Sequence, residues 1–443
     1  MRKLLILFLL ALSSNLQAQE DLLLSGPMVG YCEMREALLW VQTNGPAVVQ
    51  FEYWRVDEPD KVMKTIAYQT NAPEAFTARI VAVQVQPGNT YNYRLLINNQ
   101  EVKRPYPLRF KTPPLWQFRT DPPAMKIALG SCLFINDEKY DRPGKGYGGD
   151  YSILERMQEM EPDIMLWLGD NTYLREPDWF TRTGIIHRYT HTRQIKEMQP
   201  LLASAANYAV WDDHDYGPND SDWTFRNKDL TLEAFRLFWG NPTYGLRNGL
   251  TNEGGITSSF QWGDADFFIV DNRWFRTPNN KTTEVRTVLG ETQLRWLVDA
   301  LVSSKATFKF VMIGGQVVNS ADVYENYANL APMERNFILN SIASEGIKNV
   351  VFLSGDRHHS ELSMVEKNGI KIYDFTASPL TSGSHDASDE PNRYRVKDSH
   401  VGIRNFGMME ITGPRLERKV VFTFYDTAGQ KLWSHEILAD HSR

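Results

Sequence analysis

The chain has 443 residues, of which 42% are hydrophobic and 23% charged, and its formal net charge is -6. This composition is ordinary for a globular protein. Its Lys and Arg residues are dispersed rather than gathered in stripes, which argues against a nucleic-acid-binding surface. A chain of this length exceeds what one hydrophobic core usually supports, so we expect two domains.

The first 18 residues have the pattern of a secretory signal peptide. Arg2 and Lys3 precede an apolar stretch at 4–12, and small and polar residues follow to Ala18. The apolar stretch is shorter than the roughly 20 residues that cross a bilayer, and we expect no integral membrane segment later in the chain. The sequence therefore predicts cleavage after residues 1–18 and a periplasmic or secreted protein.

The next part of the chain, at 20–115, reads as an all-β domain. Turn signals at 44–46 and 87–89 separate stretches that are rich in β-branched and aromatic residues. Regular short strands of this kind predict a small immunoglobulin-like β-sandwich. The predicted strands are 37–43, 47–54, 76–85 and 90–99.

Four prolines, Pro113, Pro114, Pro122 and Pro123, then suggest a linker between domains. Residues 116–443 would form the second domain, which we expect to be α/β, because its apolar strands alternate with helices. We expect a helix at 152–160, with Ser152 and Glu155 as a capping box, and a second helix at 291–303. Further strands are expected at 267–271, 308–314, 407–411, 419–426 and 431–438.

The most informative feature of this α/β part is that four apolar strands each end in residues that bind metals. These segments are KIALGSC (126–132), IMLWLGDNTY (164–173), YAVWDDHD (208–215) and NVVFLSGDRHH (349–359). Open α/β folds build their sites at the carboxyl edge of the sheet. Convergence of the four ends would hold two metal ions.

Asp170, which directly follows Gly169, is the expected bridging carboxylate. Tyr173 is either a phenolate ligand, which suits a hard ion such as Fe(III), or a ring packed beside the strand end. Three interpretations of Cys132 are open. It is a thiolate ligand, which would favour a transition metal; or it is a buried apolar side chain; or it forms a disulfide with Cys32.

In the segment 211–220 we expect Asp213 to bind metal and His214 to face the substrate, where it would stabilise or protonate a leaving oxygen. Asp212 and Asp215 could orient the ligands. The alternative is an Asx-rich turn that caps the next helix.

In the segment 354–360, Asp356 and His358 would point the same way if strand geometry persists there. Arg357 is a candidate for phosphate contact or an ordinary surface arginine. Arg273 and Arg276 are candidates for substrate contact or for structural salt bridges, and Asn319 is a candidate for lining the site.

The motifs GSC, GDNTY, WDDHD, LGETQLRWL and GDRHH, in this order, resemble those of the alkaline phosphatase D family within the calcineurin-like metallophosphoesterases. With the β domain in front, the resemblance spans nearly all of the mature chain. It implies a four-layer α/β/β/α catalytic domain and hydrolysis of phosphate mono- or diesters.

Carried over by motif, the resemblance implies that Cys132, Asp170 and Tyr173 bind a ferric ion. Asp213 and Asp356 would bind calcium or another divalent ion, His358 would complete the set, and Asn219 would touch metal or phosphate. The chain departs from the familiar site at Gln316, where a His is usual. It also lacks a twin-arginine signal, so we expect export in the unfolded state.

The sequence thus predicts an exported metal-dependent phosphoesterase acting on a small-molecule or lipid phosphate ester. Two alternatives stay open. One is a phospholipase D-like phosphodiesterase on the same fold, a choice that the loops near 136–150 and 381–395 would decide. The other is an inactive surface binding protein. The chain carries no Gly-x-Ser-x-Gly elbow, Walker loop or His-Glu-x-x-His motif.

Overall fold

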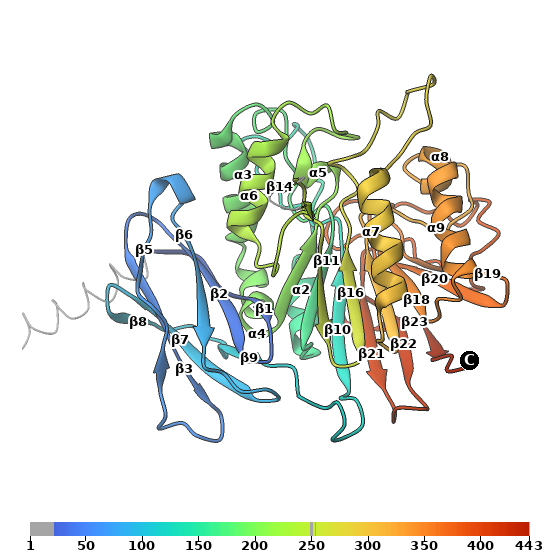
Figure 1. The fold of residues 1–443 in the computed structure, drawn as a ribbon. Helices are drawn as coiled ribbons and strands as arrows, with labels where there is room; N and C mark the ends of the chain where they lie inside the picture. Colours follow the sequence, from blue (N-terminus) through green and yellow to red (C-terminus); the bar gives the residue numbers. More distant parts are fainter. Residues whose placement is uncertain (1–21, 249–250, 253, 443) are drawn as a thin grey trace, which may run out of the picture.

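The computed structural model describes residues 22–248, 251–252 and 254–442 (Figure 1). The predicted signal peptide at 1–18 lies outside the described residues. No helix in these ranges is long and apolar enough to cross a membrane.

Two six-stranded sheets form the centre of the α/β part. The first sheet has the order β12 (Ala206–Val210), β11 (Ile164–Leu168), β10 (Met125–Gly130), β21 (Asn405–Thr412), β22 (Lys419–Asp426) and β23 (Lys431–Leu438). The second has the order β15 (Ser258–Trp262), β16 (Ala265–Ile269), β17 (Phe308–Met312), β18 (Val350–Ser354), β20 (Ile370–Thr376) and β19 (Glu361–Lys367). In the first sheet β10 pairs in parallel with β11, and β11 with β12. In the second sheet β16 pairs in parallel with β17, β17 with β18, and β18 with β20.

Aromatic side chains join the two sheets face to face. Phe375 of β20 lies 4.5 Å, centroid to centroid, from both Phe422 and Phe424 of β22. Tyr208 of β12 stacks on Phe260 of β15 at 3.6 Å. These contacts align the carboxyl ends of the parallel strands of both sheets in one region, which is where the candidate site forms.

Helices cover the outer faces of the sheets (Figure 1). The helices are α2 (Ile153–Glu159), α3 (Arg182–Arg193), α4 (Gln199–Ser204), α5 (Asp213–Tyr216), α6 (Lys228–Phe238), α7 (Gly290–Ser303), α8 (Tyr327–Leu330) and α9 (Pro332–Ser344). Leu297 and Leu301 of α7 and Ile338 of α9 are buried in the same cluster as Val311 and Phe352 of the second sheet. The α/β fold expected from the sequence is thus confirmed, as is the helix expected at 291–303.

The capping box expected at the start of α2 is wrong. The side chain of Ser152 makes no capping hydrogen bond, and its backbone is already helical, with φ -57° and ψ -17°. The turn before it is closed by the backbone instead, because Ile153 N–H donates to the carbonyl of Asp150 at 3.0 Å.

The N-terminal residues form two further sheets. The three-stranded sheet contains β1 (Leu23–Cys32), β2 (Glu36–Thr43) and β6 (Thr77–Val83). The other contains β3 (Val48–Arg55), β4 (Met63–Lys64), β5 (Tyr68–Gln69), β7 (Thr90–Ile97), β8 (Gln100–Val102) and β9 (Arg109–Lys111). A short hairpin of β13 (Arg247–Asn248) and β14 (Thr251–Asn252) completes the strands described.

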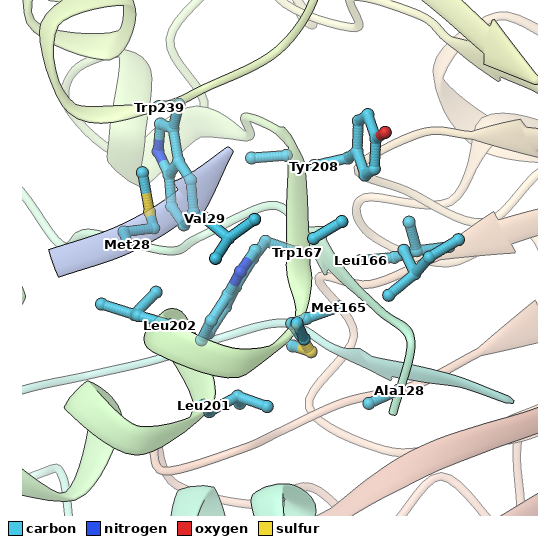
Figure 2. Close-up of a cluster of buried hydrophobic side chains, with 14 of the residues drawn as sticks. Met28, Val29, Ala128, Met165, Leu166, Trp167, Leu201, Leu202, Tyr208 and Trp239 are labelled. Atoms are coloured by element: carbon cyan, nitrogen blue, oxygen red, sulfur yellow. The ribbon is translucent and has the colours of Figure 1, made fainter. Parts of the chain in front are cut away.

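Strand β1, which the sequence did not predict, joins the N-terminal sheets to the α/β part. Its Met28 and Val29 pack beside Trp167, Leu202 and Trp239 (Figure 2). Backbone contacts reinforce this packing, since Tyr31 N–H donates to the carbonyl of Gly240 at 2.8 Å. One continuous hydrophobic core therefore crosses the boundary near residue 115.

Candidate metal centre

The structure brings the four ligand-bearing strand ends together. Cys132 follows β10, Asp170 follows β11, Asp213 follows β12 and Asp356 follows β18. The Cys132 sulfur lies 3.7 Å from Asp170 Oδ2 and 3.6 Å from the backbone carbonyl oxygen of Asp356. Residues from both sheets thus share one buried region.

The backbone at these positions is unusual. Cys132, Asp170, Asp356 and His358 all have positive φ, at 58°, 51°, 69° and 55°. Non-glycine residues rarely adopt this conformation, and such strain concentrates at functional sites. The expected strand alternation does not explain how Asp356 and His358 are aimed, because β18 ends at Ser354 and the chain turns after it.

Three overlapping groups of side chains among the described residues could hold a metal ion. They are Cys132, Asp170 and His358; Asp170, Asp213 and His214; and Asp212, Asp213 and Asp356. Within each group the ligand atoms lie within 4.8 Å of one another. Asp170 and Asp213 each belong to two groups, which is the arrangement that lets a carboxylate bridge neighbouring ions. The Tyr173 hydroxyl lies beside the first group, 3.2 Å from His358 Nε2.

The donor set fits metal ions. Asp212 Oδ2 and Asp356 Oδ2 are buried and have no hydrogen-bond partner, and a carboxylate oxygen left in this state is costly. Burial, and then the neighbouring carboxylates, raise the pKa of Asp170 and Asp356 well above the usual range. Cations bound between them would satisfy the free oxygens and favour the ionised form.

Asp212 has a larger part than the orienting role that its sequence position suggested, because it joins a ligand group. Asp215 does orient: it accepts N–H groups from Asn171 at 3.1 Å and from Asp212 at 3.0 Å. These bonds tie the loop after β11 to the loop after β12. The Asx-rich turn held open as an alternative is therefore also present, as the start of the short helix α5.

Two buried arginines form ion pairs with the carboxylates of the cluster and with Glu325. Arg273 is 1% exposed, and its guanidinium contacts Asp212, lies 3.6 Å from Asp213 Oδ1 and lies 3.3 Å from Glu325 Oε2. Arg276 lies 3.1 Å from Glu325 Oε1. Burial, the largest single effect, would raise the pKa of Asp213. Arg273, together with His214, Arg276 and the backbone N–H of Asp220, outweighs it, and the pKa falls below its usual value.

Arg273 therefore lies in the carboxylate cluster and not in the cavity where substrate contact was expected. The sequence missed Glu325, because nothing in its local pattern marks it as the partner of two arginines that precede it by about 50 positions. Arg357 is likewise engaged, since its Nη2 lies 2.5 Å from Glu390 Oε1 and its side chain is only 8% exposed.

Gln316 and Asn319 belong to a buried polar network beside the site. Gln316 Nε2 donates to Thr376 Oγ1 at 2.9 Å and to Glu361 Oε1 at 3.1 Å. Asn319 Nδ2 donates to Gln316 Oε1 at 2.9 Å. Asn319 thus packs behind the site, and both the nitrogen and the oxygen of the Gln316 amide are engaged in this network.

Both cysteines are free thiols, so the structure holds no disulfide between Cys32 and Cys132. Cys32 is the last residue of β1, and its side chain is buried in the core. Cys132 accepts a hydrogen bond from Ser378 Oγ at 3.2 Å. Burial, followed by the charge of Asp170, raises the pKa of the Cys132 thiol, so a metal would have to displace its proton.

A cavity of about 650 Å³ opens on the ligand groups. Its lining includes His214, His358, Tyr173, Arg175 and Asn219. Tyr147 and other residues of the segment 141–147 line it as well. Tyr147 closes over the ligands, with its hydroxyl 3.1 Å from His358 Nδ1. The sequence pointed only to the loop near 136–150, without assigning it any residue.

His214 is placed between the ligand groups and the cavity. Its ring centroid lies 4.3 Å from that of Tyr173, and its Nδ1 is buried without a hydrogen-bond partner. Burial lowers the pKa of His214 below 6.5; Asp213 opposes this shift and Arg175 adds to it. His214 is therefore a neutral imidazole at and above neutral pH.

The close packing around Asp212 makes Gly314 a sensitive position. A Cβ added there would lie 2.5 Å from Asp212 Cγ, whereas one added at Gly45 would meet nothing within 4 Å. We expect Gly314→Ala to lower the free energy of unfolding by about 1–3 kcal/mol. It should also weaken metal binding by about 10–100-fold, the usual effect of disturbing the groups that orient ligands.

Thermal unfolding and metal titration of both variants would check this expectation. Gly45→Ala is the matched control and should behave like the wild type. If Gly314→Ala bound metal as tightly as Gly45→Ala, Asp212 would not belong to the metal centre.

Sequence and structure comparisons give this geometry a context. The profile of a family described as PhoD-like phosphatase matches residues 138–420, and one described as a domain of unknown function matches residues 20–115. Alkaline phosphatase D of Bacillus subtilis is 24% identical over 418 residues, covering 80% of this chain and 67% of that protein. A solved structure of PhoD shares the fold, with a TM-score of 0.74 at 18% identity over 94% of this chain and 93% of its own.

Proposed function

Since the chain belongs to the PhoD-like phosphatase family, we propose that it cleaves phosphate esters at a centre of two or more metal ions. The chain is a phosphoric ester hydrolase of an α/β fold, in agreement with the resemblance found in its sequence. The observation that carries the two-ion proposal is the sharing of Asp170 and Asp213 between ligand groups. An inactive binding protein finds no support in a family of phosphatases.

Two kinds of metal position are distinguished by their donors. Cys132, Asp170, Tyr173 and His358 combine a thiol, a carboxylate, a phenol and an imidazole, a set that suits Fe³⁺. Asp212, Asp213 and Asp356 offer only oxygen, which suits Ca²⁺ or another divalent ion. When bound, the ions supply Lewis-acid activation of water and neutralise charge on the phosphoryl oxygens.

The protein's own groups would position the ester and assist its cleavage. His214, neutral and turned toward the cavity, would donate a hydrogen bond to the departing oxygen or to the charge that develops on it. Asn219, which lines the cavity and donates to Tyr324 at 3.1 Å, could contact a phosphoryl oxygen. Arg273 and Arg357 would act by holding carboxylates.

The chain would also consist of two domains and be exported. Two sheets within residues 20–115, whose buried side chains belong to one hydrophobic cluster, support an immunoglobulin-like sandwich ahead of a catalytic domain at 116–443. The leader-like pattern at 1–18 supports export to the periplasm or outside the cell. The substrate would be a small phosphate monoester or diester; a lipid phosphodiester is the alternative that the assay below decides.

The test compares an aryl phosphate, a bis-aryl phosphate and phosphatidylcholine as substrates for protein purified from its exported location. We expect hydrolysis of at least one aryl ester that a chelator abolishes and added metal restores. Elemental analysis and a visible spectrum of the same sample should show iron and a tyrosinate–Fe³⁺ absorption band.

The outcomes separate the parts of the proposal. An active but colourless and iron-free protein would remove the ferric assignment. Activity that survives complete metal removal would contradict the metal centre itself, and a preference for phosphatidylcholine would favour the lipid diesterase.

A further inference from the structure

The cavity beside the ligand groups has a strongly basic wall. Of the residues that line it, Arg142, Lys145 and Arg175 are cationic and Asp141 is the acidic one. Asp141 is already engaged, because its Oδ1 lies 3.1 Å from Nη1 of the buried Arg188. The part of the cavity away from the metal ligands therefore carries positive charge that the protein's own carboxylates only partly neutralise.

The three cations lie at different depths. The Arg175 side chain is only 12% exposed, and its guanidinium carbon lies 5.8 Å from the Phe134 ring centroid. Its Nε makes no hydrogen bond, although it lies 3.8 Å from Glu176 Oε2. Arg142 is 71% exposed and Lys145 is also exposed, so both lie toward the opening. The Phe134 ring that Arg175 contacts lies 4.9 Å, centroid to centroid, from the ring of Tyr173, which places Arg175 at the end of the cavity near the metal ligands.

The pairing of Arg142 with Glu176 would not prevent Arg142 from binding an anion. Its Nη2 lies 2.7 Å from Glu176 Oε1, but Glu176 is itself 45% exposed. Exposed ion pairs of this kind contribute at most about 1 kcal/mol. A substrate anion held inside a cleft with partly apolar walls gains more, because the low-dielectric surroundings focus the field of the cations.

Aromatic side chains supply the rest of the wall. Phe134 and Tyr147 meet edge to face, with centroids 5.1 Å apart, and Trp179 lines the same cavity. A leaving group bound here would thus contact apolar rings while cations surround it. A neutral leaving group would pack against the rings but form no ion pair with the cations.

We propose that this cavity selects phosphate esters whose leaving group carries a second anionic group. Arg175 contacts the ester beside His214, and Arg142 and Lys145 bind the distal anion at the opening. This inference rests on the proposed function, and it adds to that function the chemical class of the substrate. It also makes these three residues determinants of specificity rather than metal ligands.

The test uses two substrates that differ only in charge, 4-(carboxymethyl)phenyl phosphate and the corresponding carboxamide. The methylene group insulates the phenol, so the two leaving groups have nearly the same acidity. For the holoenzyme at low ionic strength we expect kcat/KM to be about tenfold higher for the acid, equivalent to about 1.4 kcal/mol. Added salt should reduce this ratio, because the cations at the opening are exposed.

Variants assign the effect to residues. In Arg142→Gln/Lys145→Gln the acid-to-amide ratio should fall close to one, whereas Arg175→Gln should lower kcat/KM for both substrates and Arg175→Lys should restore part of it. Arg156→Gln is the control, since Arg156 lies on α2, is 39% exposed and pairs with Glu159; its ratio should match that of the wild type.

Two outcomes would overturn the inference while leaving the proposed function intact: equal kcat/KM for acid and amide in the wild type, or an unchanged ratio in the double variant. Hydrolysis of neither substrate, nor of the aryl esters used above, would instead overturn the proposed function. Thermal unfolding of each variant shows that the fold is retained, which we expect because Arg142 and Lys145 are exposed.

Discussion

Replacing Asp170 by Asn is expected to abolish both metal binding and hydrolysis while the protein stays folded. Asp170 belongs to two of the ligand groups, lies 3.7 Å from the Cys132 sulfur and accepts the backbone N–H of His214 at 3.2 Å. An amide keeps the shape of the side chain but loses the charge that bridges two cations. We expect kcat/KM to fall by roughly 10³-fold or more, which corresponds to about 4 kcal/mol.

Although it abolishes metal binding, the same substitution should make the metal-free protein more stable. Burial, followed by Asp213, Asp212 and other carboxylates, raises the pKa of Asp170 well above its unfolded value. A group with a raised pKa stabilises the fold when protonated, at low pH, and that contribution is lost as the pH rises through the folded-state pKa. Metal-free Asp170→Asn should therefore unfold at a higher temperature than metal-free wild type at pH 8.

Metal content, kcat/KM and thermal unfolding, each with and without chelator, check both expectations together. Adding metal should reverse the order of the melting temperatures, since only the wild type gains from binding. Asp299→Asn on the exposed face of α7 serves as the control and should change none of these three quantities. If Asp170→Asn kept its metal and its activity, the two-ion model would be wrong.

The strand ends could be predicted from the sequence because their signal is local. An apolar run that stops at Gly169–Asp170 or Gly355–Asp356 marks a buried strand and its carboxyl end without reference to any distant residue. Parallel pairing within each sheet and the facing of the two sheets then bring the ends together. The family resemblance, which the comparisons confirm, followed from the order of the same local motifs.

The orientation of individual side chains could not be predicted in this way. Asp212 enters a ligand group because Arg273 and Asn272, about 60 positions later, fix its Oδ1 and leave its Oδ2 free. The orientation of the Asp356 and His358 side chains depends on a positive φ. This conformation favours glycine, so it cannot be predicted from an Asp or a His in the sequence. Both properties arise from contacts that are distant in sequence.

Strand β1 was missed for a related reason. Its sequence, LLSGPMVGYC, contains two glycines and a proline, which weaken a strand pattern. In the fold these residues permit close approach, because a Cβ at Gly30 would lie 3.0 Å from the Cα of Gly240. The packing of β1 against the segment that follows α6 therefore depends on small residues that read as turns when the sequence is taken alone.

Replacing His214 by Gln should lower kcat by about 10²–10³-fold while the bound metal is retained, and this outcome separates the two roles that the structure leaves to His214. Its ring is near enough to Asp170 and Asp213 to be a ligand, yet it also lines the cavity with a free Nδ1. The hydrogen bond that His214 makes to Asp170 comes from its backbone N–H, so Gln keeps it. Only the imidazole is removed.

The pH profile supplies a second readout of the same substitution. Because burial lowers the pKa of His214 below 6.5, protonation of the ring would reduce wild-type activity only below that pH, and the neutral form acts at higher pH. We expect this acid limb to disappear in His214→Gln and to persist in the control His435→Gln on β23. Loss of metal from His214→Gln would instead make the imidazole a ligand, and the developing charge would then be met by the metal ions and Arg175 alone.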